Sequence, residues 1–440
     1  MLKQILRLSN YLFRFKFSLR YPTNKAVLLV HREGLELLMH FVESSSISIA
    51  DPERPNVFVL LRMLFRANKG LVGYLNAYIS LVNPKVVLTF IDNDISFYRL
   101  KERFPEVAFV SIQNGLRNDF ARADNYGFLS QLDAVSKGER LSATTICTFG
   151  DATGEQYSEY IDAETNTIGS LKNNLYENHA EEQQFDITFI SQHPPLSIRD
   201  EPGQVYFGHN SVLFGSYYQI EFEVVKFLGD YCRQHNLQLA VSGKRENGFG
   251  TERDFFLGAL GPNPAQFIPR DSNFSTYDTL SVTGVIVTID STVGYEFLSR
   301  GQRVAFFSSR INSADPNLAS TIRDTNFGFP LQLEDRGPFW SNIGGAPEYE
   351  RILDHLRAVA DEEWATEIAP YNETLMAYQP GNPVFKKLLL DLGLTLMDGV
   401  KSDAYWLFDS YHWWHRVFRP RICAYDVGKV QPEETRDLFS

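Results

Sequence analysis

Short apolar runs that alternate with amphipathic stretches organise most of the chain. The runs that we expect to form buried strands are residues 26–30, 57–61, 85–91, 107–112 and 144–149 in the first half, and residues 186–191, 237–241, 285–289 and 304–307 in the second. Between them, segments such as 71–82 and 217–235 repeat apolar residues at helical spacing. Because strands that alternate with helices form parallel sheets covered on both faces, the pattern predicts a doubly wound α/β fold.

The apolar runs fall into two groups, separated by a polar and acidic stretch at residues 176–184. A chain of 440 residues is also too long for one ordinary core. We therefore expect a basic amphipathic segment at 1–25, a first Rossmann-like domain at 26–175, a second at 185–375, and C-terminal helices with a tail at 376–440.

Composition narrows the class of protein. The net charge of −12 argues against general binding of nucleic acid, which needs a basic excess. No apolar run approaches the ~20 residues of a membrane span. Cys147, Cys232 and Cys423 lie far apart, which argues against a disulfide framework or a zinc site. These features are typical of a protein of the reducing cytoplasm.

Two segments depart from the acidic character of the chain. Residues 1–25 contain lysines, arginines and many apolar residues but no acidic residue, and residues 405–421 combine tryptophans with arginines and histidines. Such segments can rest on an anionic membrane surface, which predicts a peripheral contact with the inner membrane. The alternative is that both are helices packed on the first domain.

The strongest local pattern lies at residues 285–307, where a buried strand leads through a hydroxyl-rich turn into a short helix and a second strand. Asp290, Ser291 and Thr292 follow the first strand, at the place where a helix amino terminus offers N–H groups to an anion. Gly294 would let a ligand lie close to the helix, and the Glu296 carboxylate could accept hydrogen bonds from a ribose. Alternatively, Ser291 or Thr292 only caps the helix and Glu296 is solvated.

A second group of candidates follows the strand at 237–241. Gly243, Lys244 and Arg245 stand at its carboxyl end, where the two cations could neutralise a phosphate. The alternative is that they are ordinary surface cations.

The segment TIDSTVGYEFLSRGQRVAFF resembles the nucleotide-binding segment of GT-B glycosyltransferases, and most closely that of bacterial capsule and lipopolysaccharide biosynthesis proteins related to CMP-Kdo and nonulosonic acid transferases. The GSxxNN string at 169–174 resembles the end of the first domain in the same proteins. The resemblance implies a GT-B fold, in which two Rossmann-like domains face each other across a cleft. It also implies that the second domain binds the nucleotide-sugar and the first domain the acceptor.

On this interpretation the first domain supplies the groups that act at the reacting carbon. Glycosyl transfer passes through an oxocarbenium-like state that needs a nearby carboxylate. Asp92 and Asp94 end a buried strand that we expect to face the cleft, and they rank first as catalytic residues, before Glu33 and Asp119. Asp92 or Asp94 could instead cap the helix that follows.

The next strand of the first domain suggests an acceptor site. Gln113, Asn114 and Arg117 follow it and could bind acceptor hydroxyls, although Asn114 and its following glycine could merely form a turn.

The sequence calls for no metal and no cofactor. The D-x-D spelling at 92–94 is common by chance and lies in the wrong half for the nucleotide. A CMP-activated sugar carries one phosphate, which Lys244 and a helix terminus could balance without a cation.

We therefore predict a metal-independent glycosyltransferase that moves a Kdo-like or nonulosonic acid sugar, of the pseudaminic or legionaminic type, from a CMP donor. The acceptor would be a surface polysaccharide or a lipid-linked glycan. Two enzymatic alternatives share the architecture, a CDP-polyol phosphotransferase and a UDP-sugar epimerase. The third alternative is a non-catalytic assembly protein.

Overall fold

The computed structural model of the chain describes residues 17–64, 70–116, 128–178, 182–192, 204–207, 210–244, 250–312, 329 and 335–397. Residues 1–16 and 405–421, which carry most of the two expected membrane contacts, lie outside these ranges. So do Arg117, Asp119 and Arg245.

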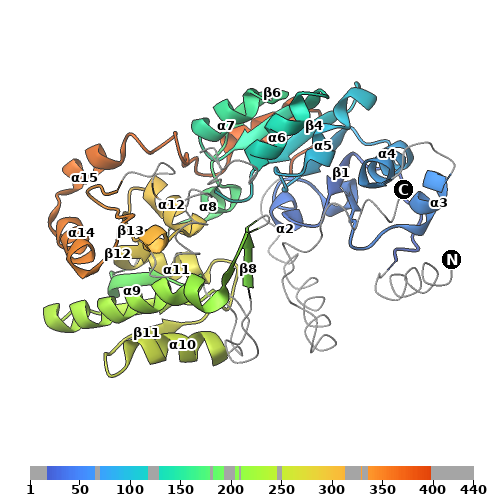
Figure 1. Cartoon of the computed structure of the whole chain (residues 1–440). Coiled ribbons are helices and arrows are strands. Elements are labelled where there is room, and N and C mark those ends of the chain that lie inside the picture. Colours follow the sequence, from blue (N-terminus) through green and yellow to red (C-terminus); the bar gives the residue numbers. More distant parts are fainter. Residues whose placement is uncertain are drawn as a thin grey trace, which may run out of the picture.

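The first domain is built on a parallel sheet of six strands in the order β2-β1-β3-β4-β5-β6 (Figure 1). Its strands are β1 (Val27–Val30), β2 (Ile47–Ala50), β3 (Val86–Thr89), β4 (Ala108–Ile112), β5 (Leu141–Thr148) and β6 (Ile161–Thr167). Its helices are α2 (Leu35–Leu38), α3 (Val57–Leu64), α4 (Gly70–Val82), α5 (Ile95–Tyr98), α6 (Phe128–Ser136), α7 (Asp151–Ser158) and α8 (Leu171–Leu175), with single turns η1 (Ser44–Ser46) and η2 (Lys101–Arg103). The central strands β1 and β3 are buried along their whole length, as expected of strands covered on both faces.

The second domain holds a parallel sheet of five strands in the order β11-β10-β7-β12-β13. Its strands are β7 (Phe185–Ile190), β10 (Leu239–Ser242), β11 (Gln266–Ile268), β12 (Thr283–Thr288) and β13 (Arg303–Phe306), and a separate hairpin pairs β8 (Gln204–Phe207) with β9 (Asn210–Leu213). The helices are α9 (Phe214–His235), α10 (Gly250–Leu260), α11 (Ser275–Ser281), α12 (Thr292–Ser299), α14 (Ala346–Ala358) and α15 (Asp361–Ile368), with the single turn η3 (Ser309–Asn312).

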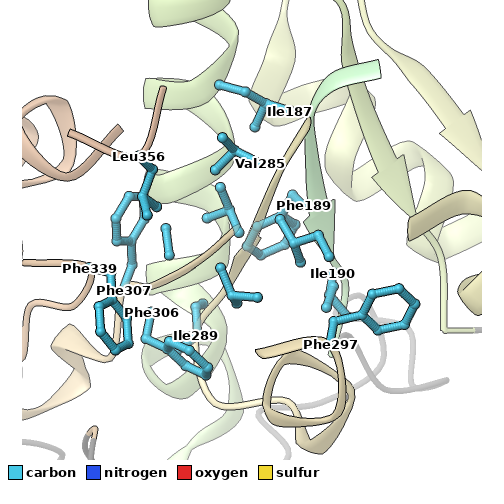
Figure 2. Close-up of a cluster of buried hydrophobic side chains, with 14 of the residues drawn as sticks. Ile187, Phe189, Ile190, Val285, Ile289, Phe297, Phe306, Phe307, Phe339 and Leu356 are labelled. Carbon is cyan, nitrogen blue, oxygen red and sulfur yellow. The ribbon is translucent and has the colours of Figure 1, made fainter. Parts of the chain in front are cut away.

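The core of the second domain is rich in aromatic side chains. Figure 2 shows Phe189 of β7 and Phe306 of β13 within this cluster, with Leu356 of α14 and Phe297 of α12 toward opposite ends of it. Phe306 stacks on Phe329 with ring centroids 4.3 Å apart. The apolar runs at 285–289 and 304–307 are therefore buried strands, as their composition predicts.

The chain returns to the first domain at its described end. Helix α16 (Pro383–Asp391) inserts Phe385 and Leu389 into the core formed by Val27 and Leu29 of β1. The two connections between the domains are tied together by Asn174, whose side chain donates to Asn382 Oδ1 and accepts from the Gln379 amide, each at 2.9 Å. The predicted two-domain GT-B fold with C-terminal helices is thus confirmed.

The local predictions failed at helix α3, at the edge strands β2, β6 and β11, and at the hairpin of β8 and β9. The run at 57–61 was predicted to be a strand, but it lies in helix α3. The reason is Asn56, whose side-chain oxygen accepts hydrogen bonds from the amides of Phe58 and Val59 and so caps the helix. Strands β2 and β6 were missed because they form the two edges of their sheet, where polar residues are tolerated and the apolar signal is weak.

None of the helices in the described ranges has both the length and the apolar character needed to cross a bilayer.

The aromatic core yields a first prediction. Replacing the fully buried Phe306 by alanine should lower the free energy of unfolding by about 3–5 kcal/mol, because it leaves a cavity against Phe329. The measurement is urea unfolding followed by tryptophan fluorescence. Leu257→Ala, at a position 41% exposed on α10, is the control and should stay within about 0.5 kcal/mol of the parent. Equal losses for both variants would contradict this account of the core.

Candidate functional site

The order of the strands marks one place in each sheet where a ligand can enter. In the first sheet the order in which successive strands are added reverses between β1 and β3, and in the second between β7 and β12. At such switch points the loops after adjacent strands run in opposite directions and leave room above the carboxyl edge. His31 and Asp94 follow β1 and β3, while Ser191, Asp290 and Ser291 follow β7 and β12.

The carboxyl edges of the two sheets lie against each other. The Leu116 amide, in the loop after β4, donates to Thr292 Oγ1 at the start of α12 over 3.4 Å. The Asn273 side chain, after β11, donates to Glu36 of α2 at 3.3 Å. Two contacts from separate loops therefore join the carboxyl edges of the two sheets.

His31 and Asp94 form a pair at the first switch point. Their atoms Nε2 and Oδ2 are 3.4 Å apart, and each side chain is 19% exposed. The other oxygen of Asp94 accepts the Ser96 amide at 2.9 Å and caps α5, so the carboxylate is fixed in direction. The predicted role of Asp94 as a cap is thus observed, and it leaves the second oxygen for the imidazole.

His31 combines a left-handed backbone conformation with a raised pKa. Its φ is +65°, a left-handed conformation that is uncommon for non-glycine residues and that Asn83, Asn236, Glu373 and Asn382 also adopt in this chain. Burial lowers the pKa of His31, but the hydrogen bond and charge of Asp94, with the charges of Glu33 and Asp51, outweigh it and raise the pKa above 6.5. His31 was not among the residues predicted from the sequence, although it directly follows the first buried strand, where functional residues are expected.

Two other predicted catalytic residues have different surroundings. Asp92 was expected to face the second domain, but it is fully buried and accepts a hydrogen bond from the Tyr157 hydroxyl at 2.8 Å. Tyr98 also donates to the Asp92 carbonyl at 2.6 Å. Asp92 therefore holds the strand end in place, and the expectation that it faces the cleft was wrong. Glu33 lies exposed in the turn after β1.

Of the two predicted acceptor residues that the structure describes, Gln113 is buried and Asn114 is exposed. Gln113 is buried, donates to the Gly115 carbonyl at 2.9 Å and accepts the Phe149 amide at 2.7 Å. Its amide group thus joins the loops after β4 and β5, so the expectation that it binds acceptor hydroxyls is corrected. Asn114 is exposed in the same loop, one residue before the turn glycine.

The start of α12 keeps its hydroxyl groups at the facing edge. Ser291 occupies the N-cap position, but its side chain makes no capping hydrogen bond, so the alternative that Ser291 is merely a cap does not hold. Its backbone amide donates to Thr288 Oγ1 at 3.1 Å. The Gly294 amide is bonded to the Ser291 carbonyl at 2.9 Å, which leaves the amides of the first turn before it without intrahelical partners.

Gly294 is required for a different reason from the one expected. A Cβ at this position would lie 2.6 Å from the Thr288 methyl group, so the helix backbone packs directly on β12. The glycine faces the sheet, and the expectation that it makes room for a ligand was wrong.

Glu296 lies inside the joint between the domains. Its carboxylate is 5% exposed and accepts hydrogen bonds from Ser170 at the end of the first domain and from Tyr277 of α11. Burial raises the pKa of Glu296, although both hydrogen bonds and the charges of Lys172 and Arg300 act against that rise. The predicted ribose contact is therefore not available in this arrangement, because protein donors already occupy both oxygens.

Lys244 lies beside the second switch point. Its side chain is exposed, with Nζ 3.5 Å from the Gln192 carbonyl after β7, and its amide donates to Glu252 at 2.8 Å. Gly243 lets the loop pass over the Phe267 ring, which would be 2.8 Å from a Cβ.

A buried cluster of charges supports this second switch point. Asp290 pairs with Arg310, which is 2% exposed, and Glu221 of α9 lies 3.8 Å from the same guanidinium. Glu221 Oε2 accepts the Gln192 amide at 3.4 Å, so the cluster links the loops after β7 and β12. Burial raises the pKa of Glu221 to about 8, despite the opposing charge of Arg310. Asp290 was predicted from the sequence as a site residue, whereas no sequence pattern pointed to Arg310 or Glu221.

Within the described ranges, no group of three or more histidine, cysteine or acidic side chains is arranged to hold a metal ion.

A protein-family model matches most of the chain. Residues 110–392, more than half of the chain, match the model of a family described as "putative O-antigen biosynthesis protein". The chain belongs to this O-antigen family. Its role in surface polysaccharide biosynthesis agrees with the resemblance seen in the sequence. None of the curated proteins compared with the chain matches it.

Several solved structures are similar to the chain at low sequence identity. UDP-GlcNAc 2-epimerase from Neisseria meningitidis bound to UDP-GlcNAc is 11% identical, with 83% of this chain and 98% of that chain covered and a TM-score of 0.42. The MnaA–UDP structure from S. aureus is 12% identical, with 86% and 98% covered and a TM-score of 0.44. The wall teichoic acid polymerase TagF soaked with CDPG is 10% identical, with 83% and 88% covered and a TM-score of 0.42. These values leave the ligand of the O-antigen family protein open.

The buried cluster predicts how stability depends on pH. Because the pKa of Glu221 is raised in the folded protein from 4.5 to about 8, the unfolded chain loses this proton first. The parent should therefore lose stability relative to Glu221→Gln as pH rises from 5 to 8, by up to about 1.4 kcal/mol per unit. The difference in the free energy of unfolding between the parent and Glu221→Gln should level off above pH 8. Urea unfolding of both proteins from pH 5 to above pH 8 measures this difference.

The matched control is Glu223→Gln, at an exposed position on the same helix. This variant should follow the parent at every pH. If Glu221→Gln also followed the parent, Glu221 would be ionised in the folded protein at neutral pH.

Proposed function

We propose that the protein is a glycosyltransferase of O-antigen biosynthesis, which binds a nucleotide-activated sugar at the start of α12 and activates the acceptor with His31. The observation that carries the proposal is the contact of the carboxyl edges of the two sheets, with Thr292 of α12 against the loop after β4, and Asn273 against α2, which follows β1. A donor held by the second domain would then face the acid–base pair of the first.

The start of α12 suits a phosphate. A helix amino terminus presents N–H groups and a partial positive charge to an anion, and the Ser291 hydroxyl is not used as a cap. Lys244 follows β10, which is separated from β12 by β7 alone, and its ammonium group adds a full positive charge at this edge of the sheet. We leave Glu296 out of this donor site, because a ribose there would have to replace both Ser170 and Tyr277.

His31 suits the role of general base. An acceptor hydroxyl has to lose its proton as it attacks the sugar carbon, and a positioned histidine can take that proton. Asp94 fixes the imidazole and stabilises the imidazolium that forms. In this proposal Asp94 keeps a place in the catalytic site as the partner of His31, and Asn114 and Arg117 remain candidates for the acceptor site.

For the donor we propose a CMP-activated Kdo-like or nonulosonic acid sugar, and for the acceptor a growing surface glycan or a lipid-linked precursor. One helix terminus with one lysine matches the single phosphate of a CMP ester. The motif resemblance at 288–307 supports the same choice. Release of CMP from a CMP-sugar, compared with turnover of CDP-glycerol and UDP-sugars, tests it directly. Turnover of UDP-sugars alone would reject the CMP donor and favour the epimerase alternative.

The donor site leads to a binding prediction. Ser291→Ala combined with Thr292→Val should weaken nucleotide binding about tenfold or more, because each hydroxyl contributes about 1 kcal/mol to a charged ligand. Isothermal titration calorimetry with CMP, CDP and UDP measures the effect and identifies the preferred base. Thr366→Val, at an exposed position on α15, is the control and should leave affinity unchanged. Undiminished affinity in the double variant would remove the nucleotide from this site.

The catalytic pair leads to a kinetic prediction. His31→Gln should lower kcat by about a hundredfold or more, the usual contribution of a general base, while nucleotide affinity is retained. Asp94→Asn should lower kcat less and move the acid limb of the pH–rate profile to lower pH, because it removes a charge that raises the pKa of His31.

The control for this pair is His235→Gln, at an exposed position near the end of α9, which should keep full activity. An unchanged rate for His31→Gln would show that another group accepts the proton.

A further inference from the structure

Helix α3 has apolar side chains on two faces, of which only one is buried. Val59 and Met63 are separated by one helical turn and pack into the first domain. Phe58 and Leu61, also on a common face, are 38% and 50% exposed. A surface helix ordinarily has one apolar stripe, so the second face of α3 calls for a partner.

The extended segment before β1 adds two more exposed apolar side chains beside this face. Leu19 is 74% exposed and Tyr21 56%, and the Tyr21 ring lies edge-on to Phe58 with centroids 5.3 Å apart. We call Leu19, Tyr21, Phe58 and Leu61 the apolar patch. Exposed apolar side chains that lie close together mark interaction sites more often than isolated ones do.

Backbone contacts hold the two halves of the apolar patch together. The Val57 amide donates to the Ser18 carbonyl at 3.0 Å, and the Asn56 side chain donates to the Arg20 carbonyl at 2.7 Å. Asn56, which is itself buried, thus caps α3 and fixes the extended segment at the same time. The patch is consequently a built surface rather than a chance exposure of a loose end.

Arginines flank the apolar patch in a protein whose net charge is −12, while the acidic residues Asp51 and Glu53 lie in the loop before α3. Arg20 lies between Leu19 and Tyr21 in the sequence, Arg62 follows Leu61, and both arginines are exposed. Residues 17–32 and 54–91 contain no aspartate or glutamate. The chain that leads into the patch, residues 1–16, has four lysines and arginines and no acid. This pattern is complementary to an anionic surface.

The position of the apolar patch suits docking without obstruction of the candidate site. Figure 1 shows α3 at the end of the first domain remote from the second domain, whereas α2, which follows His31, lies on the side toward the second domain. A surface that bound α3 would leave the facing edges of the two sheets accessible.

We propose that the apolar patch docks the protein on an anionic lipid bilayer, with Leu19, Phe58 and Leu61 inserted among the lipids. The tyrosine ring and the arginines have the amphipathic character of residues found at the level of the headgroups. The acidic headgroups would pair with Arg20 and Arg62. This inference goes beyond the proposed transfer reaction and does not depend on it, because it concerns a surface on the opposite side of the first domain.

Co-sedimentation with phosphatidylcholine vesicles, with and without phosphatidylglycerol, tests the proposal on the full chain without nucleotide. The parent should bind the vesicles that contain phosphatidylglycerol. Leu19→Ser with Leu61→Ser should reduce the bound fraction severely, and Arg20→Glu with Arg62→Glu should weaken binding about tenfold or more, since each cation near the surface contributes to attraction. The charge variants should bind phosphatidylcholine vesicles no worse than the parent does.

The chain offers a matched control in its other exposed leucines. Leu257→Ser with Leu390→Ser changes two leucines that are 41% and 55% exposed on α10 and α16, and should leave vesicle binding intact. Urea unfolding checks that all variants are folded, as expected for exposed positions.

Two results would overturn the proposal. Vesicle binding by the patch variants equal to that of the parent would place any membrane contact elsewhere in the chain. A dimer of the parent that dissociates in Leu19→Ser with Leu61→Ser, seen by sedimentation velocity without vesicles, would show that a second copy of the chain covers the patch. Transfer activity on a soluble acceptor should be unaffected in every one of these variants, so failure here is distinguishable from failure of the proposed reaction.

Discussion

The joint between α8 and α12 is the contact on which the candidate site depends. Ser170 donates to the buried Glu296 carboxylate, and Asn173 and Arg300 are joined by hydrogen bonds from the guanidinium to the Asn173 side chain and carbonyl. These bonds connect the last helix of the first domain to the helix whose other end carries Ser291 and Thr292. The position of the hydroxyl groups relative to the first sheet is therefore set by polar contacts that are shielded from water, where each bond is strong and each unpaired group costly.

The second switch point rests on charges that are expensive to bury. A guanidinium between two carboxylates is stable in a core only when the geometry satisfies most of the donors and acceptors. Here Asp290 pairs with Arg310 directly, while Glu221 remains at 3.8 Å with a raised pKa, so one carboxyl tends to stay neutral. A hydrophobic cluster would hold the loops after β7 and β12 at lower cost. The charges hold these loops next to the start of α12, where we propose that the nucleotide-activated sugar binds.

The fold could be predicted from the sequence where one periodicity dominated. The buried strands around Val287 and the amphipathic helix α9 were found because their apolar residues follow one repeat throughout. Helix α3 was mistaken for a strand because its apolar residues cover two faces, and its cap, Asn56, stands outside the apolar run. Edge strands such as β6 gave little signal, since solvent accepts their polar side chains.

The candidate site was less accessible to such analysis. The pairing of His31 with Asp94 depends on the adjacency of β1 and β3, which only the strand order reveals. Likewise, Asp92 and Glu296 were suitable in type and position along the chain, but tertiary packing turned both carboxylates toward protein donors. Residue type and spacing located the edges where ligands can bind, whereas the direction of each side chain followed from contacts far apart in the sequence.

The two connections between the domains meet at Asn174. The chain leaves the first domain just after this residue and returns beside it, and a Cβ on Gly169 would lie 2.0 Å from the Ala377 carbonyl oxygen, so the two passages are in close contact. The two backbone passages are thus joined at one place by the hydrogen bonds of Asn174. Any sliding of one domain past the other would have to break these bonds.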